Sequence, residues 1–151
     1  MGNLARNTTA ATVIASYRSD AVYPHTLYAA QPAAGFPAPA DDAVERSLDI
    51  NELVVRNPAA TFFVRVRGDS MEGAGIFADD VLVVDRAIPV RSGAIVVAAV
   101  FGELVVKRLS VKAGVTSLVS ENDEYAPMVI SDSEDCFVWG VVVGSVRVFQ
   151  A

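Results

Sequence analysis

The sequence predicts a mainly β protein: a compact, twisted antiparallel assembly forming a partly closed β-barrel, with one short helix and an N-terminal arm. Two observations lead to this fold class. From Thr61 onward, short segments rich in Val, Ile and Phe alternate with glycine-containing turns, which is the pattern of successive short strands. The chain has 151 residues, of which 52% are hydrophobic, and these values suit a single domain with an ample core.

Residues 1–34 make up the predicted arm, because they show neither helical nor strand periodicity. Their apolar content is broken into pieces that are too short for the centre of a signal peptide. The arm is also too short for a helix-turn-helix domain with its linker, and we find no such motif in its pattern. We therefore expect a flexible or weakly docked segment.

The stretch from Asp41 to Arg56 is the region with helix signals. Asp49 can cap a first turn, and Glu52, three residues later, completes a pair that resembles a capping box. The helix has to end before Pro58, because proline disfavours helical geometry in the residue that precedes it. We expect this helix to pack against the core and to take no part in chemistry.

The rest of the chain predicts strands joined by tight turns. Phe101-Gly102 differs from the Asn-Gly and Asp-Gly pairs that two-residue hairpins prefer, so we expect a less regular turn there. The expected strands cover residues 61–67, 80–86, 94–100, 103–109, 115–120 and 136–149, and the other turns fall at 73–75, 92–93 and 112–114.

Composition excludes several classes of function. The net charge of −6 disfavours direct, strong nucleic-acid binding, so any work on DNA would go through protein partners. One cysteine and one histidine provide neither a disulfide framework nor a metal cluster with nitrogen and sulfur ligands, and no cofactor is expected. No run approaches the roughly 18 apolar residues of a membrane span. These features suit a cytoplasmic protein.

Ser70 is the candidate nucleophile. It lies in the run Arg67-Gly68-Asp69-Ser70-Met71, between an apolar predicted strand and a glycine-rich loop. Gly68 allows backbone conformations that other residues resist, so we expect a turn that presents the serine hydroxyl, exposed, at the strand end. A serine becomes a good nucleophile when a neighbouring base accepts its proton. Otherwise, a serine after Gly-Asp is a common turn residue.

The choice of a base is narrow. His25 lies in the arm, and the lysines are Lys107 and Lys112. Lys107 falls within a predicted strand, on the same face as Val105 and Leu109, where partial burial is expected. Burial favours the neutral amine, and lowering the pKa from about 10.4 to about 7 corresponds to about 4–5 kcal/mol. On these residues alone, a solvated edge lysine is the commoner interpretation.

Taken together, these segments resemble the LexA/UmuD family of self-cleaving Ser-Lys peptidases (peptidase S24-like), and within it the UmuD branch. The resemblance covers roughly residues 33 to 148 and includes the spacing from Ser70 to Lys107. Each piece is a weak motif, but their order along the chain makes the combination specific. The segments that carry the resemblance are 34–40, 48–53, 68–71, 79–85, 93–100, 105–109 and 121–127.

The resemblance implies an enzyme, a serine peptidase that acts on its own chain. Ser70 would be the nucleophile and Lys107 the general base, and the backbone N–H groups of Ser70 and Met71 would stabilise the oxyanion. The cleavage site would be the bond between Ala34 and Gly35, since members cut between a small residue and glycine. Cleavage would divide the chain into an arm, 1–34, and a Ser-Lys peptidase-like β domain, 35–151.

The resemblance also implies a role and partners. It suggests a DNA damage (SOS response) protein whose self-cleavage is stimulated by the RecA–single-stranded DNA filament. The processed form would be a homodimer that supports translesion, error-prone DNA synthesis with a UmuC-like polymerase catalytic subunit. The apolar stretch from Val138 to Phe149 would be a buried strand or the dimer contact, and the contact is favoured.

Two other functions stay open from the sequence. A non-catalytic binding module of the same fold would yield no cut product, and the presence of both Ser70 and Lys107 counts against it. The cleavable half of a LexA-like repressor would need a DNA-binding domain, which we do not expect in this chain.

Overall fold

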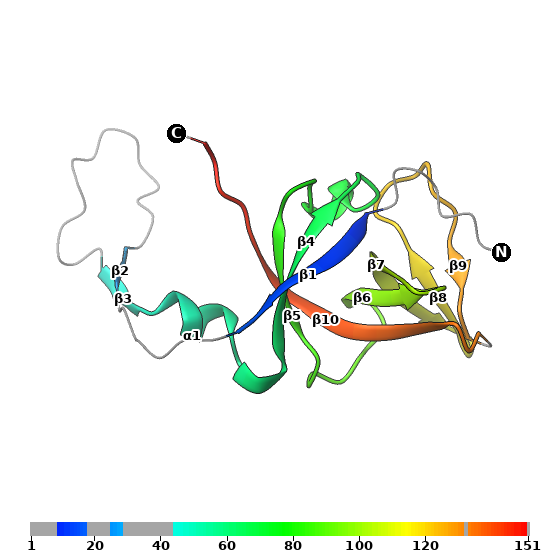
Figure 1. Ribbon diagram of the computed structural model, residues 1–151, viewed down its shortest axis with the longest axis horizontal. Helices are drawn as coiled ribbons and strands as arrows, with labels where there is room; N and C mark the ends of the chain where they lie inside the picture. The colour runs from blue at the N-terminus through cyan, green and yellow to red at the C-terminus, as the bar shows by residue number, and fades with distance from the viewer. Residues whose placement is uncertain (1–8, 18–24, 29–43, 132, 151) are drawn as a thin grey trace.

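The computed structural model describes residues 9–17, 25–28, 44–131 and 133–150, and this part of the chain is mainly β with one short α-helix, as the sequence predicts (Figure 1). Helix α1 spans Ile50–Val54, and 3-10 turns span Pro58–Ala60 and Glu72–Ala74. The strands are β1 (Ala10–Ser16), β2 (His25–Tyr28), β3 (Val44–Leu48), β4 (Thr61–Arg67), β5 (Val81–Asp85), β6 (Ile95–Val100), β7 (Glu103–Lys112), β8 (Val115–Val119), β9 (Met128–Val129) and β10 (Cys136–Val146).

Most of the strands belong to one antiparallel sheet that closes on itself. The sheet order is β1-β4-β5-β10-β6-β7-β8-β9, and β1 also pairs with β7. β1 therefore lies between β4 and β7 and completes a ring of strands. β2 and β3 form a separate two-stranded sheet, which Figure 1 shows next to α1 at one end of the molecule.

Alternation along the strands produces two buried apolar clusters. On β7, Val106 belongs to the first cluster, whereas Val105 and Leu109 belong to the second. Successive strand residues point to opposite faces, so the two clusters fill the two sides of this strand. Lys107 shares the alternation of Val105 and Leu109 and is only 7% exposed, so the predicted burial of this lysine is confirmed.

The predicted helix from Asp41 to Arg56 is mostly wrong. α1 covers five residues, Ile50–Val54, while residues 44–48 form β3 and residues 41–43 lie outside the described residues. Asp49 is the N-cap, as predicted, and its carboxylate accepts from the Asn51 N–H at 2.9 Å. The cap marks where the helix begins, and the chain before it pairs with β2 as an extended strand.

Within the predicted arm, residues 10–16 form a strand. β1 pairs antiparallel with β4, from Ala10 opposite Arg67 to Ser16 opposite Phe62. In β1 the side chain of Ala11 is buried and the other six are exposed, so the strand has no apolar alternation for the sequence to reveal. The backbone pairing with β4 holds β1 in place instead.

The Phe101-Gly102 turn is more regular than expected. Val100 pairs with Glu103, and the two residues between them both have positive φ, 49° for Phe101 and 83° for Gly102. Positive φ at both central residues is the geometry of a type I′ hairpin turn. The expectation of an irregular turn is therefore wrong, because the long β6–β7 ladder imposes this geometry despite the unfavourable residue type.

The C-terminal apolar stretch enters the sheet as an interior strand. β10 pairs with β6 over residues 136–141 and with β5 over residues 141–146, so each half of the strand is hydrogen-bonded to a neighbouring strand of the same sheet. Beyond it, Val148 and Phe149 are 85% and 81% exposed. The strand itself is thus part of the sheet, and the apolar residues left for a contact lie at its end.

Candidate active site

Ser70 is held in a tight turn directly after β4. Gly68 has φ of 94°, a conformation that glycine adopts without strain, and it turns the chain out of the strand. Met71 follows, is fully buried and belongs to the first core cluster. The serine is therefore fixed between a strand end and a buried anchor.

Lys107 reaches this serine from β7. Its Nζ lies 3.3 Å from Ser70 Oγ, within hydrogen-bonding distance. Removal from water penalises the charged form, and this burial lowers the pKa of Lys107 from 10.5 to about 8. The structure thus brings the two sequence-predicted residues together.

Ser120 is a third member of the cluster that sequence reasoning missed. Its Oγ accepts from Lys107 Nζ at 2.6 Å. The signal was present in the β7–β8 hairpin: Lys112 pairs with Val115 and Arg108 with Val119, so the same register places residue 120 opposite Lys107. Ser120 fixes the amine at the end of a long, flexible side chain.

The loop after β8 packs over the Ser70 turn. The Gly73 N–H donates to the Glu121 carbonyl at 2.9 Å, and the Tyr125 hydroxyl donates to Asp69 Oδ1 at 2.8 Å. The Tyr125 ring centroid lies 5.3 Å from Lys107 Nζ. Partial burial and the bond to Asp69 raise the pKa of Tyr125 to about 12, so this side chain stays neutral.

Thr9 completes the surroundings of the serine. The Thr9 N–H donates to Ser70 Oγ at 2.9 Å, and the Ser70 hydroxyl donates to Thr9 Oγ1 at 3.0 Å. Both residues are fully buried. The expectation of an exposed serine hydroxyl is therefore wrong, because the residue before β1 covers it. Thr9 lies in a stretch without periodicity, so the sequence offered no signal for this contact.

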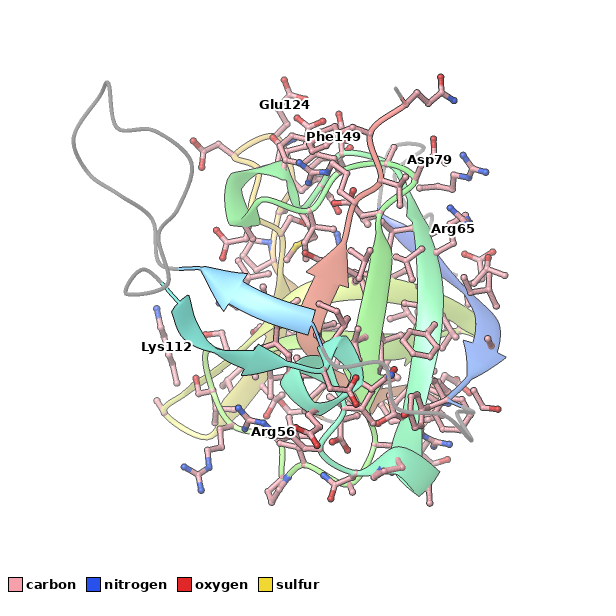
Figure 2. The ribbon with its side chains drawn as sticks, turned by 90° about the vertical axis from the view of Figure 1, so that its left-hand side faces the viewer. Arg56, Arg65, Asp79, Lys112, Glu124 and Phe149 are labelled. Atoms are coloured by element: carbon pink, nitrogen blue, oxygen red, sulfur yellow. The ribbon has the colours of Figure 1, made fainter. Side chains whose placement is uncertain are left out.

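The other predicted residues are not brought to this cluster by the described structure. Ala34 and Gly35 lie outside the described residues. His25 is the first residue of β2, in the separate two-stranded sheet. Lys112 is exposed at the end of β7 and points away from the fold (Figure 2). Of the lysines, Lys107 is the one that faces a buried hydroxyl.

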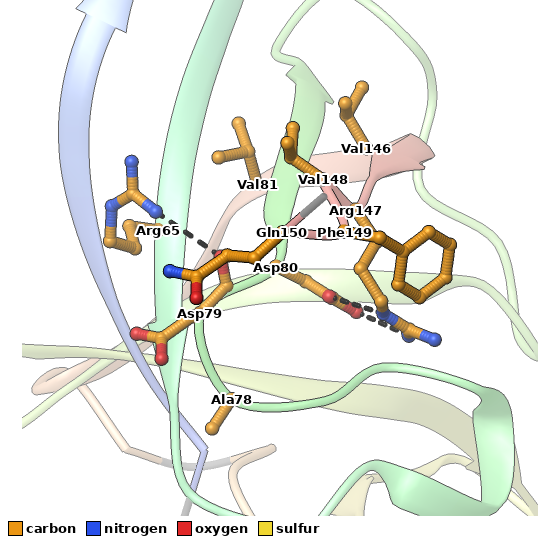
Figure 3. Close-up of a pocket in the computed structure, with 10 residues that line it drawn as sticks. All are labelled: Arg65, Ala78, Asp79, Asp80, Val81, Val146, Arg147, Val148, Phe149 and Gln150. Atoms are coloured by element: carbon orange, nitrogen blue, oxygen red, sulfur yellow. Dashed lines mark hydrogen bonds and ion pairs between the residues drawn. The ribbon is translucent and has the colours of Figure 1, made fainter.

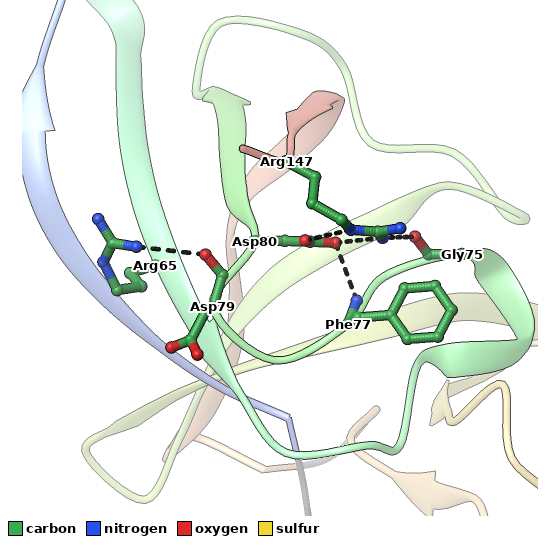
Figure 4. Close-up of polar contacts among 6 residues, drawn as sticks. All are labelled: Arg65, Gly75, Phe77, Asp79, Asp80 and Arg147. Atoms are coloured by element: carbon green, nitrogen blue, oxygen red, sulfur yellow. Dashed lines mark hydrogen bonds and ion pairs between the residues drawn. The ribbon is translucent and has the colours of Figure 1, made fainter. Parts of the chain in front are cut away.

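A hollow with a volume of about 480 Å³ lies on the surface, away from the Ser70 cluster (Figure 3). It is lined by Arg65 of β4, by residues 78–81 leading into β5 and by residues 146–150 at the end of β10 and beyond, and its lining does not include Ser70 or Lys107. At its base Arg147 donates to both carboxylate oxygens of Asp80, each at 2.7 Å (Figure 4). The Arg147 bonds lower the pKa of Asp80. The pair links chain segments, and we assign it no chemistry.

In the described part of the chain, no three His, Cys, Asp or Glu side chains are grouped as metal ligands. Asp79, Asp80 and Asp85 serve local bonds instead: Asp85 accepts from Asn57 and from the Ala87 N–H, and Asp79 pairs with Arg67. None of the helices in the described ranges is long and apolar enough to span a membrane.

The cluster has the parts for nucleophilic acyl transfer. An amine with a pKa of about 8 is neutral in roughly a tenth of molecules at pH 7, and a neutral amine can accept a proton. Lys107 Nζ is within hydrogen-bonding distance of Ser70 Oγ, the atom whose proton it would have to accept. A serine that loses its proton to a neighbouring base becomes a competent nucleophile.

Comparisons with known proteins lead to the same group of proteins. Protein MucA of Salmonella typhimurium is 40% identical over 119 residues, which is 79% of this chain and 82% of that protein. Protein ImpA of Shigella flexneri is 41% identical over 124 residues, 82% of this chain and 83% of that protein. The LexA repressor of Shewanella sediminis is 41% identical over 118 residues, 78% of this chain and 57% of the repressor.

A family model described as Peptidase S24-like matches residues 26–143, a span that includes the Ser70 turn, β7 and the loop that covers them. The resemblance read from the sequence is thereby confirmed. This match and the relatives above establish that the chain belongs to the Peptidase S24-like family.

Proposed function

We propose that this protein is a serine peptidase that cleaves its own chain between Ala34 and Gly35, with Ser70 as nucleophile and Lys107 as general base. The observation that carries the proposal is the 3.3 Å contact between Lys107 Nζ and Ser70 Oγ in a buried site where the lysine pKa is about 8. Membership of the Peptidase S24-like family supports the same reaction type.

The proposed reaction begins with neutral Lys107. The amine accepts the Ser70 proton while the serine oxygen attacks the carbonyl carbon of Ala34. The N–H groups of Ser70 and Met71 stabilise the oxyanion that forms. The Ala34–Gly35 bond then breaks, the Gly35 nitrogen takes the proton from Lys107, and water hydrolyses the acyl-enzyme to regenerate the serine.

The proposed cellular role is in the SOS response to DNA damage. The resemblance to the UmuD branch suggests that the RecA–single-stranded DNA filament stimulates cleavage. The processed form, residues 35–151, would be a cytoplasmic homodimer that supports translesion synthesis with a UmuC-like polymerase subunit. The exposed end of the chain, with Val148 and Phe149, offers apolar surface for the dimer contact.

Intact mass over time tests the reaction. Purified full-length protein is incubated at neutral and mildly alkaline pH, with and without RecA filament, beside Ser70→Ala and Lys107→Ala. Lys112→Ala is the matched control, because Lys112 is the exposed lysine of the same strand. We expect a product beginning at Gly35 in the wild type and in the control, and none in the other variants.

A full-length mass in every condition would contradict self-cleavage and favour a non-catalytic binding module. A product that persists in Ser70→Ala would place the chemistry elsewhere. Mixing Ser70→Ala with a variant that carries an uncleavable Ala34→Pro bond would then tell whether one chain cuts another.

A further inference from the structure

β1 occupies the gap between the two strands that supply the candidate catalytic residues. It pairs with β4 along its length and reaches β7 at Ala10. Thr9 extends the bridge, because the Val106 N–H donates to the Thr9 carbonyl at 2.9 Å. β4 leads into Ser70 and β7 carries Lys107, so β1 lies between the two strands that supply these residues (Figure 1).

The hydrogen bonds of Ser70 are all used in this arrangement. A serine hydroxyl has one donor and two acceptor positions. Lys107 Nζ and the Thr9 N–H donate to the oxygen, and its own proton is directed to Thr9 Oγ1. The proton therefore points away from the base that has to accept it, and no lone pair is left to attack a carbonyl.

A peptide substrate would need the place that β1 holds. Its scissile carbonyl must come within contact of Ser70 Oγ, and a peptide that enters a β fold usually adds as a strand to free backbone edges. The edges of β4 and β7 next to Ser70 are paired with β1 and Thr9. Two strands cannot use the same edges at the same time.

The attachment of β1 is also weak in apolar contacts. Ala11 is its one buried side chain, while Val13 and Ile14 are 40% and 46% exposed. Segments with few buried apolar contacts open at a lower free-energy cost than the core. Release of β1 therefore requires little beyond the loss of its backbone pairing and of the Thr9 bonds.

We propose that β1, with Thr9 at its head, is an internal inhibitory strand that takes the substrate's place at Ser70 and has to leave before self-cleavage. This inference rests on the proposed function, because it takes the chain itself as the substrate. The inference adds a step to the reaction that the chemistry of Ser70 and Lys107 does not include. In this step, the substrate segment replaces β1 between β4 and β7.

The test measures the reactivity of Ser70 separately from self-cleavage. A fluorophosphonate probe reports it: Ser70 Oγ forms a bond to phosphorus, fluoride leaves, and Lys107 takes the hydroxyl proton. Labelling is followed by intact mass on full-length protein for the wild type, Thr9→Val and Thr9→Pro. Thr12→Val is the matched control, because it makes the same change at an exposed position of β1, three residues after Thr9.

We expect labelling to rise about fivefold in Thr9→Val, which loses one buried hydrogen bond, and tenfold or more in Thr9→Pro, which also loses the N–H. Thr12→Val should label at the wild-type rate. Equal rates in all four proteins, or no labelling of Thr9→Pro, would overturn the inference. Faster labelling of the Thr9 variants with no product beginning at Gly35 would support the inhibitory role of β1 and contradict the proposed self-cleavage.

A reversible cross-link gives the opposite perturbation. Ala10 and Arg67 are exposed partners on β1 and β4, and paired residues of antiparallel strands lie about 4.5–5.5 Å apart, a distance that a disulfide can span. In the Ala10→Cys/Arg67→Cys variant, oxidation should lower the labelling rate at least tenfold, and reduction should restore it. Unchanged labelling of the oxidised protein would also overturn the proposal.

Discussion

At the scale of single residues, Lys107 is described in a resting state. Its amine donates to Ser70 Oγ and to Ser120 Oγ, which is what a protonated lysine does. Catalysis needs the other protonation state, in which the amine accepts. Burial makes that state accessible near neutral pH because it lowers the pKa to about 8.

The rate of self-cleavage should therefore follow the neutral fraction of Lys107. We expect the first-order rate constant to rise about tenfold per pH unit below pH 7.5 and to level off above about pH 9. The measurement is the rate of appearance of the Gly35 product between about pH 6 and about pH 10. A rate that is flat or falls over this range would remove Lys107 as the base.

Stability should change in the same direction with pH. The unfolded chain binds the lysine proton with a pKa of 10.5 and the folded chain with a pKa of about 8, so the unfolded state holds more protons between these values. The free energy of unfolding should then rise with pH through this window, apart from other groups. The Lys107→Ala variant provides the baseline for the pH dependence of both the cleavage rate and the free energy of unfolding.

The residues of the site differ in how far the sequence predicts them. Lys107 could be placed beside Val105 and Leu109 because strand alternation is a local property. Ser70 could be placed in a turn, but its burial could not, since Thr9 lies 61 positions away and in an unpatterned stretch. Ser120 required the register of a hairpin as well as its existence. Contacts set by tertiary pairing were the ones that sequence reasoning missed.

At the scale of elements, the site depends on how closely the loop after β8 approaches the Ser70 turn. A side chain at Gly73 would put its Cβ 2.5 Å from the Glu121 carbonyl oxygen, and that oxygen belongs to backbone. The contact holds the loop that begins at Ser120, the partner of Lys107. Glycine at position 73 therefore lets this loop come close enough for the Ser120 hydroxyl to contact Lys107.

Gly73→Ala should damage both stability and cleavage. We expect a loss of about 1–3 kcal/mol in the free energy of unfolding, as for other overpacked sites, because backbone must move. Cleavage should fall about tenfold or more, since Ser120 moves with the loop. Denaturant unfolding and intact mass measure the two effects.

Gly102→Ala is the control for this prediction. Gly102 has φ of 83° but nothing within 4 Å of an added Cβ, so alanine there meets backbone strain alone. The Gly102→Ala change should lower the free energy of unfolding by about 1 kcal/mol and leave the cleavage rate unchanged. Equal cleavage by the two variants would show that the approach at Gly73 does not position the site.

Elements were predicted well where burial follows a strand period. The strands from β4 to β8, and β10, all correspond to predicted segments, because each has buried Val, Ile or Leu positions and a turn at its ends. β1, β2, β3 and β9 were missed, because the sequences of these short strands show no clear alternation of apolar and polar residues. The Asp49 cap was found, but the helix was extended backwards through residues that pair with β2.

At the scale of the whole molecule, the segment after β10 is tied to the residue that precedes β5. Asp80 is 1% exposed, accepts from Arg147 near the C-terminus, and also accepts from the Phe77 N–H at 2.9 Å. The bonds to Arg147 keep the pKa of Asp80 below its usual value of 3.8. Its contribution to stability is therefore present at neutral pH and is lost as the pH falls through that lowered pKa.

Asp80→Asn should lower the free energy of unfolding by about 2 kcal/mol at pH 7, because charge-assisted hydrogen bonds are replaced by weaker ones. Asp79→Asn is the matched control. Asp79 is exposed, pairs with Arg67 at the surface and has φ of 73°, which asparagine tolerates. The free energy of unfolding of Asp79→Asn should differ from that of the wild type by no more than about 0.5 kcal/mol. Urea unfolding of both variants measures the two free energies of unfolding. Equal losses in the two variants would contradict the larger stabilising role assigned to Asp80.

The position of β1 upstream of the proposed scissile bond has a kinetic consequence. While it is tethered, a strand competes for its site at an effective concentration in the millimolar range. After cleavage at Gly35 the same strand is a separate peptide, present only at the concentration of the protein itself, and it dissociates as it is diluted. One covalent event thus turns a reversible exchange of strands into a lasting change, and the cut chain keeps the edges of β4 and β7 free for another partner.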